Sequence, residues 1–179
     1  MLGGFKSMQR NLFSWLLALL AATLLSGALL SSPAQAREVV FFPGFGPGTI
    51  VIKTKERRLY FVLGDGYAIR YPVGVGRAGR QWAGVSYIDG KYVQPDWSPP
   101  WEIRRDKPTL PEVIPGGSPH NPMGAAALTL SGGEYAIHGT NQPRSIGGFV
   151  SYGCIRMFNE DVVDLFARVG LGAPVVVTR

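Results

Sequence analysis

The sequence contains very few of the side chains that form disulfides or bind transition metals. Among its 179 residues there is a single cysteine, Cys154, and there are only two histidines, His120 and His138. One cysteine cannot form an internal disulfide, and a zinc site of the usual ligand types would need carboxylates as well. The composition therefore excludes a disulfide scaffold and argues against a zinc peptidase, and we expect neither a metal nor a cofactor.

Charged residues are also sparse, at 17% of the chain, and the formal net charge is +6. The lysines and arginines are scattered and do not alternate with aromatic residues, as they would in a nucleic-acid-binding surface. We therefore expect no nucleic-acid partner. A mild positive charge suits an anionic partner such as the cell wall or an outer-membrane surface, although a solvated face is the simpler interpretation.

The longest apolar run lies at the N-terminus, where Lys6 and Arg10 precede the apolar residues 12–30 and residues 34–36 read Ala-Gln-Ala. A basic start, an apolar centre and a small-x-small ending describe a secretory signal peptide. We predict that residues 1–36 are removed, that the net charge falls to +4, and that the mature chain reaches the periplasm. The alternative is an uncleaved inner-membrane anchor, because an apolar run of about 20 residues can span a bilayer.

Export makes the lone cysteine informative, because a thiol in an oxidising compartment is exposed to oxidation. The simplest alternative is that Cys154 is a small buried hydrophobe. Its neighbours favour a chemical role, since Gly153 permits close approach of the backbone and Arg156 shares its face if the segment is extended. With His138 sixteen residues upstream as a base, Cys154 is a candidate nucleophile for covalent acyl transfer.

The chain after residue 36 begins with strand-forming runs separated by short turns. Residues 37–48 are rich in glycine and proline and predict a loosely attached lead-in segment. The β-branched and aromatic runs that follow predict a three-stranded meander, and then a pair of strands that turn at Asp89 and Gly90. The predicted strands are Thr49–Thr54, Arg58–Leu63, Tyr67–Gly76 and the two halves of Gly84–Val93.

Residues 94–122 differ sharply in composition from the rest of the chain. Eight of the fourteen prolines lie there, together with Trp97, Trp101 and Ile103. Long loops without regular structure are uncommon unless they are functional or disordered, and a disordered linker would not favour large apolar side chains. We predict an ordered flap or wall beside a groove; the alternative is a surface loop with no role in substrate binding.

The C-terminal part predicts further strands and one helix. Ala125–Leu130, Tyr135–Gly139 and Pro174–Thr178 read as strands. Asn159 is a candidate helix N-cap, because acidic residues follow it and an apolar face then runs to Gly170. We therefore predict a single, mostly β domain with one short α-helix after the cysteine segment. The apolar face of that helix consists of Val162, Val163, Leu165, Phe166 and Val169.

Two segments together carry a specific signature. Ile137–Thr140 reads Ile-His-Gly-Thr, and Ser151–Met157 reads Ser-Tyr-Gly-Cys-Ile-Arg-Met. They resemble the signature of the L,D-transpeptidase catalytic-domain family, the YkuD-type cysteine transpeptidases of peptidoglycan. The resemblance extends over most of the chain and implies that residues 49–179 form the catalytic domain. The supporting matches are Arg58–Tyr60, Tyr71–Gly76, Pro95–Pro100, Pro115–Gly117, Asn121–Gly124 and Asn159–Asp161.

The resemblance implies a fold, a reaction and two catalytic residues. The family fold is a mostly β, sandwich-like domain with a short helix near the cysteine. Cys154 matches the nucleophile, and His138 matches the base that later acts as acid. The family reaction takes a peptidoglycan stem tetrapeptide as acyl donor, releases its terminal D-alanine and transfers the acyl group to an amine. The acceptor is another stem peptide, giving 3-3 cross-links, or a lipoprotein lysine or the N-terminus of an outer-membrane protein, giving wall-anchored protein.

Neighbouring residues are candidates for oxyanion stabilisation and for orienting the base. Backbone N–H groups near Gly153 and Cys154 are placed to stabilise the oxyanion of a tetrahedral intermediate. The resemblance suggests that a backbone carbonyl near Gly139 orients His138, and the alternative is Ser151.

Two more residues are candidates for substrate binding. Arg156 has a planar guanidinium that binds carboxylates bidentately; the alternative is an internal ion pair with Asp161 or Asp164. Tyr152 stands where many relatives carry histidine, and its phenol donates a hydrogen bond but does not titrate near neutrality. We expect this difference to alter rate, pH profile or acceptor choice without removing the nucleophile or the base. His120 is predicted to be a loop histidine.

Three functions agree with these residues. The first is an exported L,D-transpeptidase that forms a thioester on Cys154. The second is a hydrolase of the same fold that releases wall-linked protein, with water in place of the acceptor amine. The third is a non-catalytic module that binds the cell wall.

Overall fold

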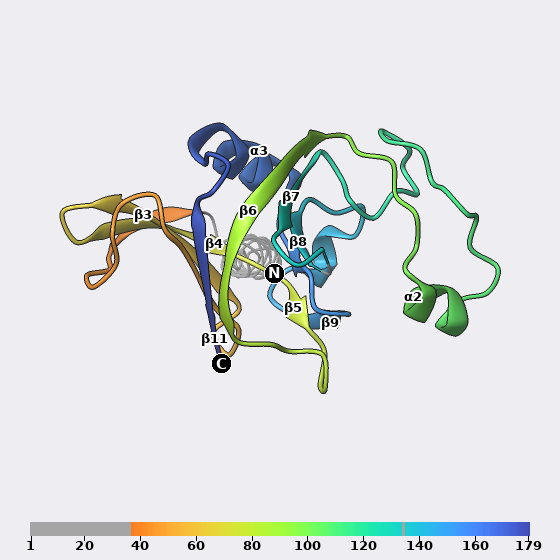
Figure 1. The fold of residues 1–179 in the computed structure, drawn as a ribbon, viewed down its shortest axis with the longest axis horizontal. Helices are drawn as coiled ribbons and strands as arrows, with labels where there is room; N and C mark the ends of the chain where they lie inside the picture. The colour runs from red at the N-terminus through yellow and green to blue at the C-terminus, as the bar shows by residue number, and fades with distance from the viewer. Residues whose placement is uncertain (1–36, 134) are drawn as a thin grey trace, which may run out of the picture. The chain divides into compact units, whose positions relative to one another are not determined.

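The structure is a computed structural model that describes residues 37–133 and 135–179 (Figure 1). The predicted signal peptide, residues 1–36, lies outside the described residues. Within the described ranges, no helix has the length and hydropathy needed to cross a bilayer.

Strands dominate the described chain, and the predicted fold class, mostly β with a helix after the cysteine segment, is confirmed. Nine strands form one sheet in the order β1-β4-β3-β2-β11-β6-β7-β8-β10, and β5 pairs with β9. Their bounds are β1 Glu38–Phe41, β2 Ile50–Lys53, β3 Arg58–Gly64, β4 Tyr67–Pro72, β5 Val75–Gly76, β6 Gly84–Val93, β7 Ala126–Leu130, β8 Ala136–His138, β9 Phe149–Ser151, β10 Ile155–Arg156 and β11 Pro174–Thr178. The helices are α2 Trp101–Asp106, the 3-10 helix η2 Pro143–Ser145 and α3 Asn159–Arg168.

The predicted meander is present as β2, β3 and β4, which pair antiparallel in sequence order. The turn between β3 and β4 contains Asp65 at φ 52° and Gly66 at φ 79°, conformations that suit aspartate and glycine in a tight reversal. The last strand, β11, pairs in parallel with β2 and antiparallel with β6. The C-terminal strand therefore joins the meander to the strands that carry the site.

The lead-in segment is not loosely attached, contrary to the expectation from its composition. Glu38–Phe41 form strand β1, which pairs antiparallel with β4 from Glu38 opposite Arg70 to Phe41 opposite Tyr67. Phe42 is buried and stacks on Tyr60 with ring centroids 4.2 Å apart. Strand pairing and aromatic packing hold the segment despite its glycines and prolines.

Gly84–Val93 is one strand rather than the predicted hairpin. Its first half pairs with β11 and its second half with β7, so β6 belongs to both arms of the sheet, as its course across Figure 1 shows. The register shifts between Ile88 and Gly90, which makes Asp89-Gly90 a β-bulge instead of a turn. A glycine fits there because a Cβ at position 90 would lie 2.5 Å from Thr129 Oγ1.

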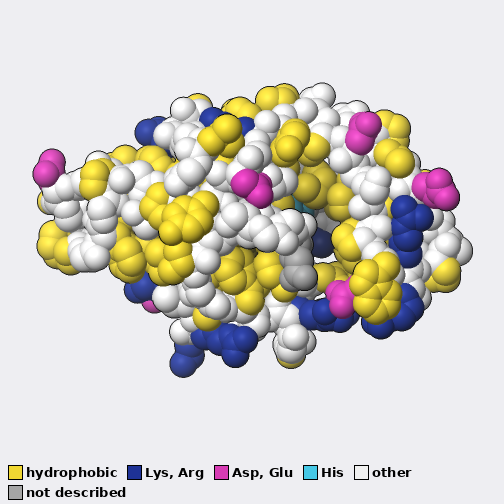
Figure 2. Space-filling view, viewed as in Figure 1, with side chains coloured by type: hydrophobic (Ala, Val, Ile, Leu, Met, Phe, Trp, Pro, Cys, Tyr) yellow, Lys and Arg dark blue, Asp and Glu magenta, His cyan; other side chains and the backbone are white. Residues whose placement is uncertain are grey.

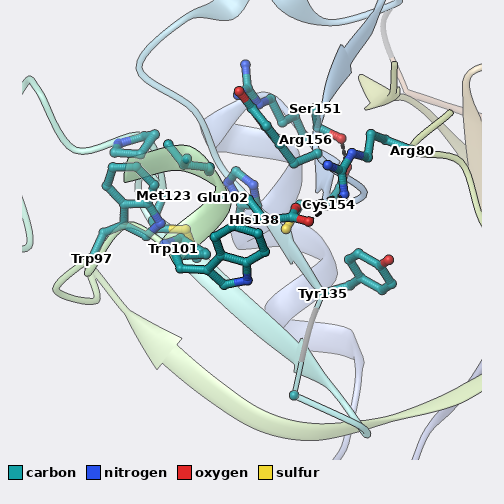
Figure 3. Close-up of a pocket in the computed structure, with 15 residues that line it drawn as sticks. Arg80, Trp97, Trp101, Glu102, Met123, Tyr135, His138, Ser151, Cys154 and Arg156 are labelled. Carbon is teal, nitrogen blue, oxygen red and sulfur yellow. Dashed lines mark hydrogen bonds and ion pairs between the residues drawn. The ribbon is translucent and has the colours of Figure 1, made fainter. Parts of the chain in front are cut away.

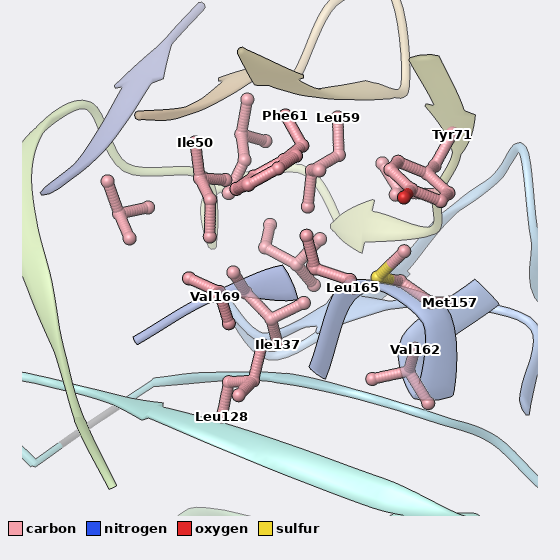
Figure 4. Close-up of a cluster of buried hydrophobic side chains, with 14 of the residues drawn as sticks. Ile50, Leu59, Phe61, Tyr71, Leu128, Ile137, Met157, Val162, Leu165 and Val169 are labelled. Carbon is pink, nitrogen blue, oxygen red and sulfur yellow. The ribbon is translucent and has the colours of Figure 1, made fainter. Parts of the chain in front are cut away.

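The main core lies between the two arms of the sheet and α3 (Figure 4). Ile50, Leu59 and Tyr71 enter it from the meander, and Leu128 and Ile137 enter it from β7 and β8. From α3, Val162 and Leu165 are fully buried as the apolar periodicity predicts, whereas Val163 is 51% exposed. Burial of these apolar side chains is the main contribution to the stability of the packing that positions β8 and β10, and with them the site.

Candidate active site

The pairing of β8 with β10 brings the two signature segments together. The strands run parallel, with Ile155 opposite Ile137 and Arg156 opposite His138. Because side chains alternate along a strand, Arg156 and His138 share one face of the sheet, and Cys154, two residues earlier, reaches the same side. Cys154, His138 and Arg156 all line one cavity of about 380 Å³, where Figure 3 shows their side chains.

The proline-rich segment forms a wall of this cavity, as predicted. Trp97, Trp101 and Ile103 line it together with Pro122 at the end of the segment. Helix α2, which the sequence did not predict, carries two of these side chains. In Figure 2 the surface is hollowed between this segment and the body of the sheet. The Cys154 side chain is therefore reached through an aromatic-walled opening and is not sealed in the core.

Polar contacts attach helix α2 to residues 151–154, the loop that carries Cys154 and is called the cysteine loop below. Tyr152 donates a hydrogen bond from its phenol to Asp106 Oδ2 at 2.7 Å, and Arg77 lies 3.3 Å from the same oxygen. The Arg77 guanidinium also lies 3.9 Å from the centroid of the Tyr152 ring. Arg80 binds both carboxylate oxygens of Glu102 at 2.8 Å. Tyr152, predicted to bind substrate, thus holds the wall while also lining the cavity.

The imidazole of His138 is buried and neutral. Its Nδ1 lies 2.7 Å from the carbonyl oxygen of Gly139, which can only accept, so Nδ1 carries the proton and Nε2 keeps the lone pair of a base. Burial lowers the pKa of His138 to about 4, and the charge of Arg156 acts in the same direction. The carbonyls of Gly139 and Pro122 oppose this shift in pKa because they favour the protonated ring.

The thiol of Cys154 is also neutral at rest. Burial raises its pKa, while a backbone hydrogen bond from Ala136 and the charge of Arg156 act in the opposite direction. The thiol and the imidazole are thus both uncharged, because the same low-dielectric surroundings penalise thiolate and imidazolium alike.

Ser151 organises the cysteine loop instead of contacting the imidazole. Its hydroxyl donates to the carbonyl oxygen of Cys154 at 2.6 Å and accepts from the N–H of Gly153 at 3.1 Å. The Gly153 N–H, one of the expected oxyanion donors, is therefore engaged within the loop. Of the expected pair, the N–H of Cys154 is left for that role.

Arg156 does not form the internal ion pair considered for it. In the described structure, Asp164 binds Arg168 at 2.9 Å and Asp161 lies 3.7 Å from Arg37. The Nε of Arg156 is buried without a hydrogen-bond partner, and burial lowers the pKa of this guanidinium. A buried, unsatisfied donor on a cavity wall is poised to bind an anion that enters the cavity.

Asn159 has a role that sequence reasoning missed. The N-cap of α3 is Phe158, and the side-chain oxygen of Asn159 instead accepts from the backbone N–H groups of Ala125 and Thr140, at 3.1 and 3.0 Å. The Asn159 oxygen approaches the backbone so closely that a Cβ at position 139 would lie 2.3 Å from it, and glycine leaves that space open. Asn159 thereby ties the chain that follows His138 to α3, and no spacing in the sequence indicates that contact.

His120 lies in a loop, as predicted, and is exposed. Within residues 37–133 and 135–179, no group of three or more histidine, cysteine, aspartate or glutamate side chains is placed to hold a metal ion.

The comparisons with known proteins agree with this geometry. Residues 47–177 match the model of the L,D-transpeptidase catalytic domain, YkuD. The probable L,D-transpeptidase ErfK/SrfK of Escherichia coli is 38% identical over 159 residues, which are 84% of this chain and 49% of that protein. The chain thus spans about half the length of this relative.

Two solved structures are similar in fold. An L,D-transpeptidase from Mycobacterium smegmatis aligns with a TM-score of 0.59 at 16% identity, over 73% of this chain and 58% of its own, which is a likeness of fold alone. A Brucella melitensis protein named a probable carnitine operon oxidoreductase is 41% identical, with a TM-score of 0.55 over 83% of this chain and 96% of its own. Its name indicates redox chemistry, whereas the family model describes a transpeptidase domain.

The fold and the site define a class: mostly β domains in which a histidine on one strand and a cysteine just before the neighbouring parallel strand share one cavity. Within that class, the chain belongs to the YkuD family of L,D-transpeptidase catalytic domains.

Proposed function

We propose that this protein is an exported cysteine L,D-transpeptidase that acts on peptidoglycan stem tetrapeptides. The observation that carries the proposal is the placement of one thiol and one neutral imidazole in the same open cavity. Family membership supports the same reaction. The catalytic residues are Cys154 as nucleophile and His138 as base and acid.

The first half-reaction forms a thioester. The Nε2 of His138 accepts the thiol proton as Cys154 Sγ attacks the amide carbonyl that precedes the terminal D-alanine, and a tetrahedral oxyanion forms. When the intermediate collapses, the C–N bond breaks, and the imidazolium gives its proton to the amine of the leaving D-alanine. The acyl group remains on sulfur.

The second half-reaction returns the enzyme to its resting state. His138 accepts a proton from the acceptor amine, which attacks the thioester carbonyl, and the C–S bond breaks. The proton then returns to the thiolate of Cys154. The acceptor is the amine of a second stem peptide, or that of a lipoprotein or outer-membrane protein; a periplasmic location, after loss of residues 1–36, would bring the protein to these substrates.

Arg156 would bind a carboxylate of the donor. Its unpartnered Nε supports this role, and its positive charge lowers the pKa of His138 in the free protein. A bound carboxylate would offset that charge and so raise the pKa of His138, which makes the imidazole a stronger base only when substrate is present. Tyr152 would contribute to binding by holding the aromatic wall.

The decisive experiment offers the protein a stem tetrapeptide as donor. Intact-mass spectrometry of the protein should show the acyl group on Cys154. Chromatography of the reaction mixture should show released D-alanine and dimeric muropeptides. Cys154→Ala should show none of these. Cleaved monomers without dimers would instead indicate the hydrolase. If Cys154→Ala retained every effect of the native protein on muropeptide composition, the wall-binding module would be the correct function.

A further inference from the structure

The carbonyl of the peptide bond between Gly153 and Cys154 accepts a hydrogen bond from a side chain outside the cysteine loop. The indole Nε1–H of Trp82 donates a hydrogen bond to the carbonyl oxygen of Gly153 at 3.0 Å. In a trans peptide the C=O and the following N–H point in opposite directions within one plane. A contact that fixes the direction of the Gly153 carbonyl therefore also fixes the direction of the Cys154 N–H.

The indole packs face to face against an aromatic ring. The rings of Trp82 and Tyr135 are stacked, with centroids 5.1 Å apart and an interplanar angle of 9°. Tyr135 also presses on the loop, since a Cβ at Gly153 would lie 2.2 Å from Tyr135 Cε1. Gly153 has φ 133°, a backbone conformation that residues other than glycine rarely adopt. The peptide plane is thus fixed by the indole, by the tyrosine ring and by a backbone conformation specific to glycine.

The direction of this plane relates the contact to catalysis. Trp82 borders a depression with Val85 and Ser86 and does not line the cavity that contains Cys154, whereas Tyr135 borders both. The Gly153 carbonyl points toward Trp82, which does not line that cavity, so the Cys154 N–H points away from Trp82. The Gly153 N–H is already engaged by Ser151, which leaves the Cys154 N–H as the oxyanion donor of this loop.

We propose that Trp82 is a positioning residue that holds the Cys154 N–H toward the oxyanion of the tetrahedral intermediate. This inference rests on the proposed acyl transfer. Preorganised donors stabilise developing charge because they need no reorientation during the reaction. Without the indole N–H, the peptide plane can rotate about the flexible glycine, and the donor loses its alignment.

The test compares a reaction that forms an oxyanion with one that does not. Acylation of Cys154 by imipenem or by a stem tetrapeptide passes through a tetrahedral oxyanion, whereas alkylation by iodoacetamide is a direct displacement at carbon. Trp82→Phe retains an aromatic ring against Tyr135 and removes the N–H together with part of the ring. We expect the acylation rate of the full-length variant to fall roughly 10- to 100-fold, mainly in kcat, with alkylation changed less than about twofold.

A matched control is Tyr60→Phe, which also removes one aromatic hydrogen-bond donor, to Glu56, but lies outside the cavity. It should acylate and alkylate at native rates. An equal fall in acylation and alkylation for Trp82→Phe, or no fall in either, would overturn the inference while leaving the acyl transfer intact. A native protein that is alkylated by iodoacetamide but acylated by neither donor would overturn the proposed function and this inference together.

Discussion

At the scale of single residues, the thiol and the imidazole of the site are both kept neutral by burial. His138 is 4% exposed and has a pKa of about 4, and the pKa of Cys154 is raised. Such a pair differs from the preformed thiolate–imidazolium pair of some cysteine enzymes, in which the thiol pKa is depressed. In the proposed reaction, proton transfer from Cys154 to His138 must therefore accompany attack on the substrate.

The first prediction concerns the reactivity of Cys154 as a function of pH. Only the thiolate reacts with iodoacetamide, so the alkylation rate should rise about tenfold for each pH unit from 6 to 9. An ion pair would instead give a plateau between the two pKa values. His138→Asn should show the same rising profile, and a rate independent of pH between 5 and 8 would contradict the neutral pair.

The second prediction concerns Arg156. Arg156→Lys retains the charge but loses the planar donor fork, so kcat/KM for a tetrapeptide should fall about 10- to 100-fold, mainly through KM. Arg144→Lys, an exposed arginine of η2, is the control and should behave as the native protein. Donors in which one carboxylate is amidated should lose the same factor with the native protein and no more with Arg156→Lys. Additive losses would show that the guanidinium binds another group.

At the scale of elements, two segments far apart in the sequence are held against the strands of the site. Helix α2 is attached to the cysteine loop through the phenol of Tyr152 and the carboxylate of Asp106, and α3 is attached to the histidine loop through Asn159. These contacts explain how a segment rich in proline becomes an ordered wall.

The third prediction tests the attachment of α2. Tyr152→Phe keeps the ring beside Arg77 but removes the donor to Asp106, a loss of about 1 kcal/mol for an exposed hydrogen bond. We expect faster hydrogen exchange at the amides of residues 101–107 and a KM for the donor raised two- to fivefold, by about that free energy. Tyr92→Phe, on the exposed side of β6, should change neither quantity. Unchanged exchange in Tyr152→Phe would show that α2 is held by other contacts.

The fourth prediction tests Asn159. Asn159→Ala leaves the N–H groups of Ala125 and Thr140 without their acceptor, and the free energy of unfolding should fall by about 2 kcal/mol in urea titrations. Asn159→Asp keeps an acceptor oxygen at the same place and should cost less. If the two variants were equally destabilised, the loss would come from the side-chain volume and not from the hydrogen bonds.

At the scale of the whole molecule, two carboxylates of α3 make the free energy of unfolding depend on pH in opposite directions. Burial raises the pKa of Asp161 to about 6, whereas hydrogen bonds from Arg168 and Tyr71 lower the pKa of Asp164 to about 2. A group whose pKa is higher in the folded state binds protons more tightly there, so its contribution to stability is present at low pH and is lost as pH rises. The reverse holds for a group whose pKa is lowered.

The fifth prediction follows from these signs. Relative to the native protein, Asp161→Asn should gain stability as pH rises from 4 to 7, by on the order of 1–3 kcal/mol. Asp164→Asn should show the opposite sign in a lower window, losing relative stability as pH rises from about 2 to 4. Thermal unfolding across this pH range measures both. A constant difference between Asp161→Asn and the native protein would mean that Asp161 does not titrate in this range.

Local patterns predicted the strands of the meander, the wall and the apolar face of α3, because alternation, proline content and helical period act over a few residues. They misassigned β6, since Asp89-Gly90 has the composition of a turn and only pairing with β7 reveals it as a bulge. They also misassigned residues 37–48, whose glycines and prolines gave no sign of the pairing with β4.

For the site, the sequence alone indicated the proposed reacting groups: one cysteine and one histidine stand in two segments whose residue types match a family signature. The tertiary structure decided which partners those groups have. The indole of Trp82 on the Gly153 carbonyl, the phenol of Tyr152 on Asp106 and the amide of Asn159 on Thr140 each join residues 19 to 71 positions apart. Contacts over such separations depend on how the strands pair and pack, and that is a property of the folded chain as a whole.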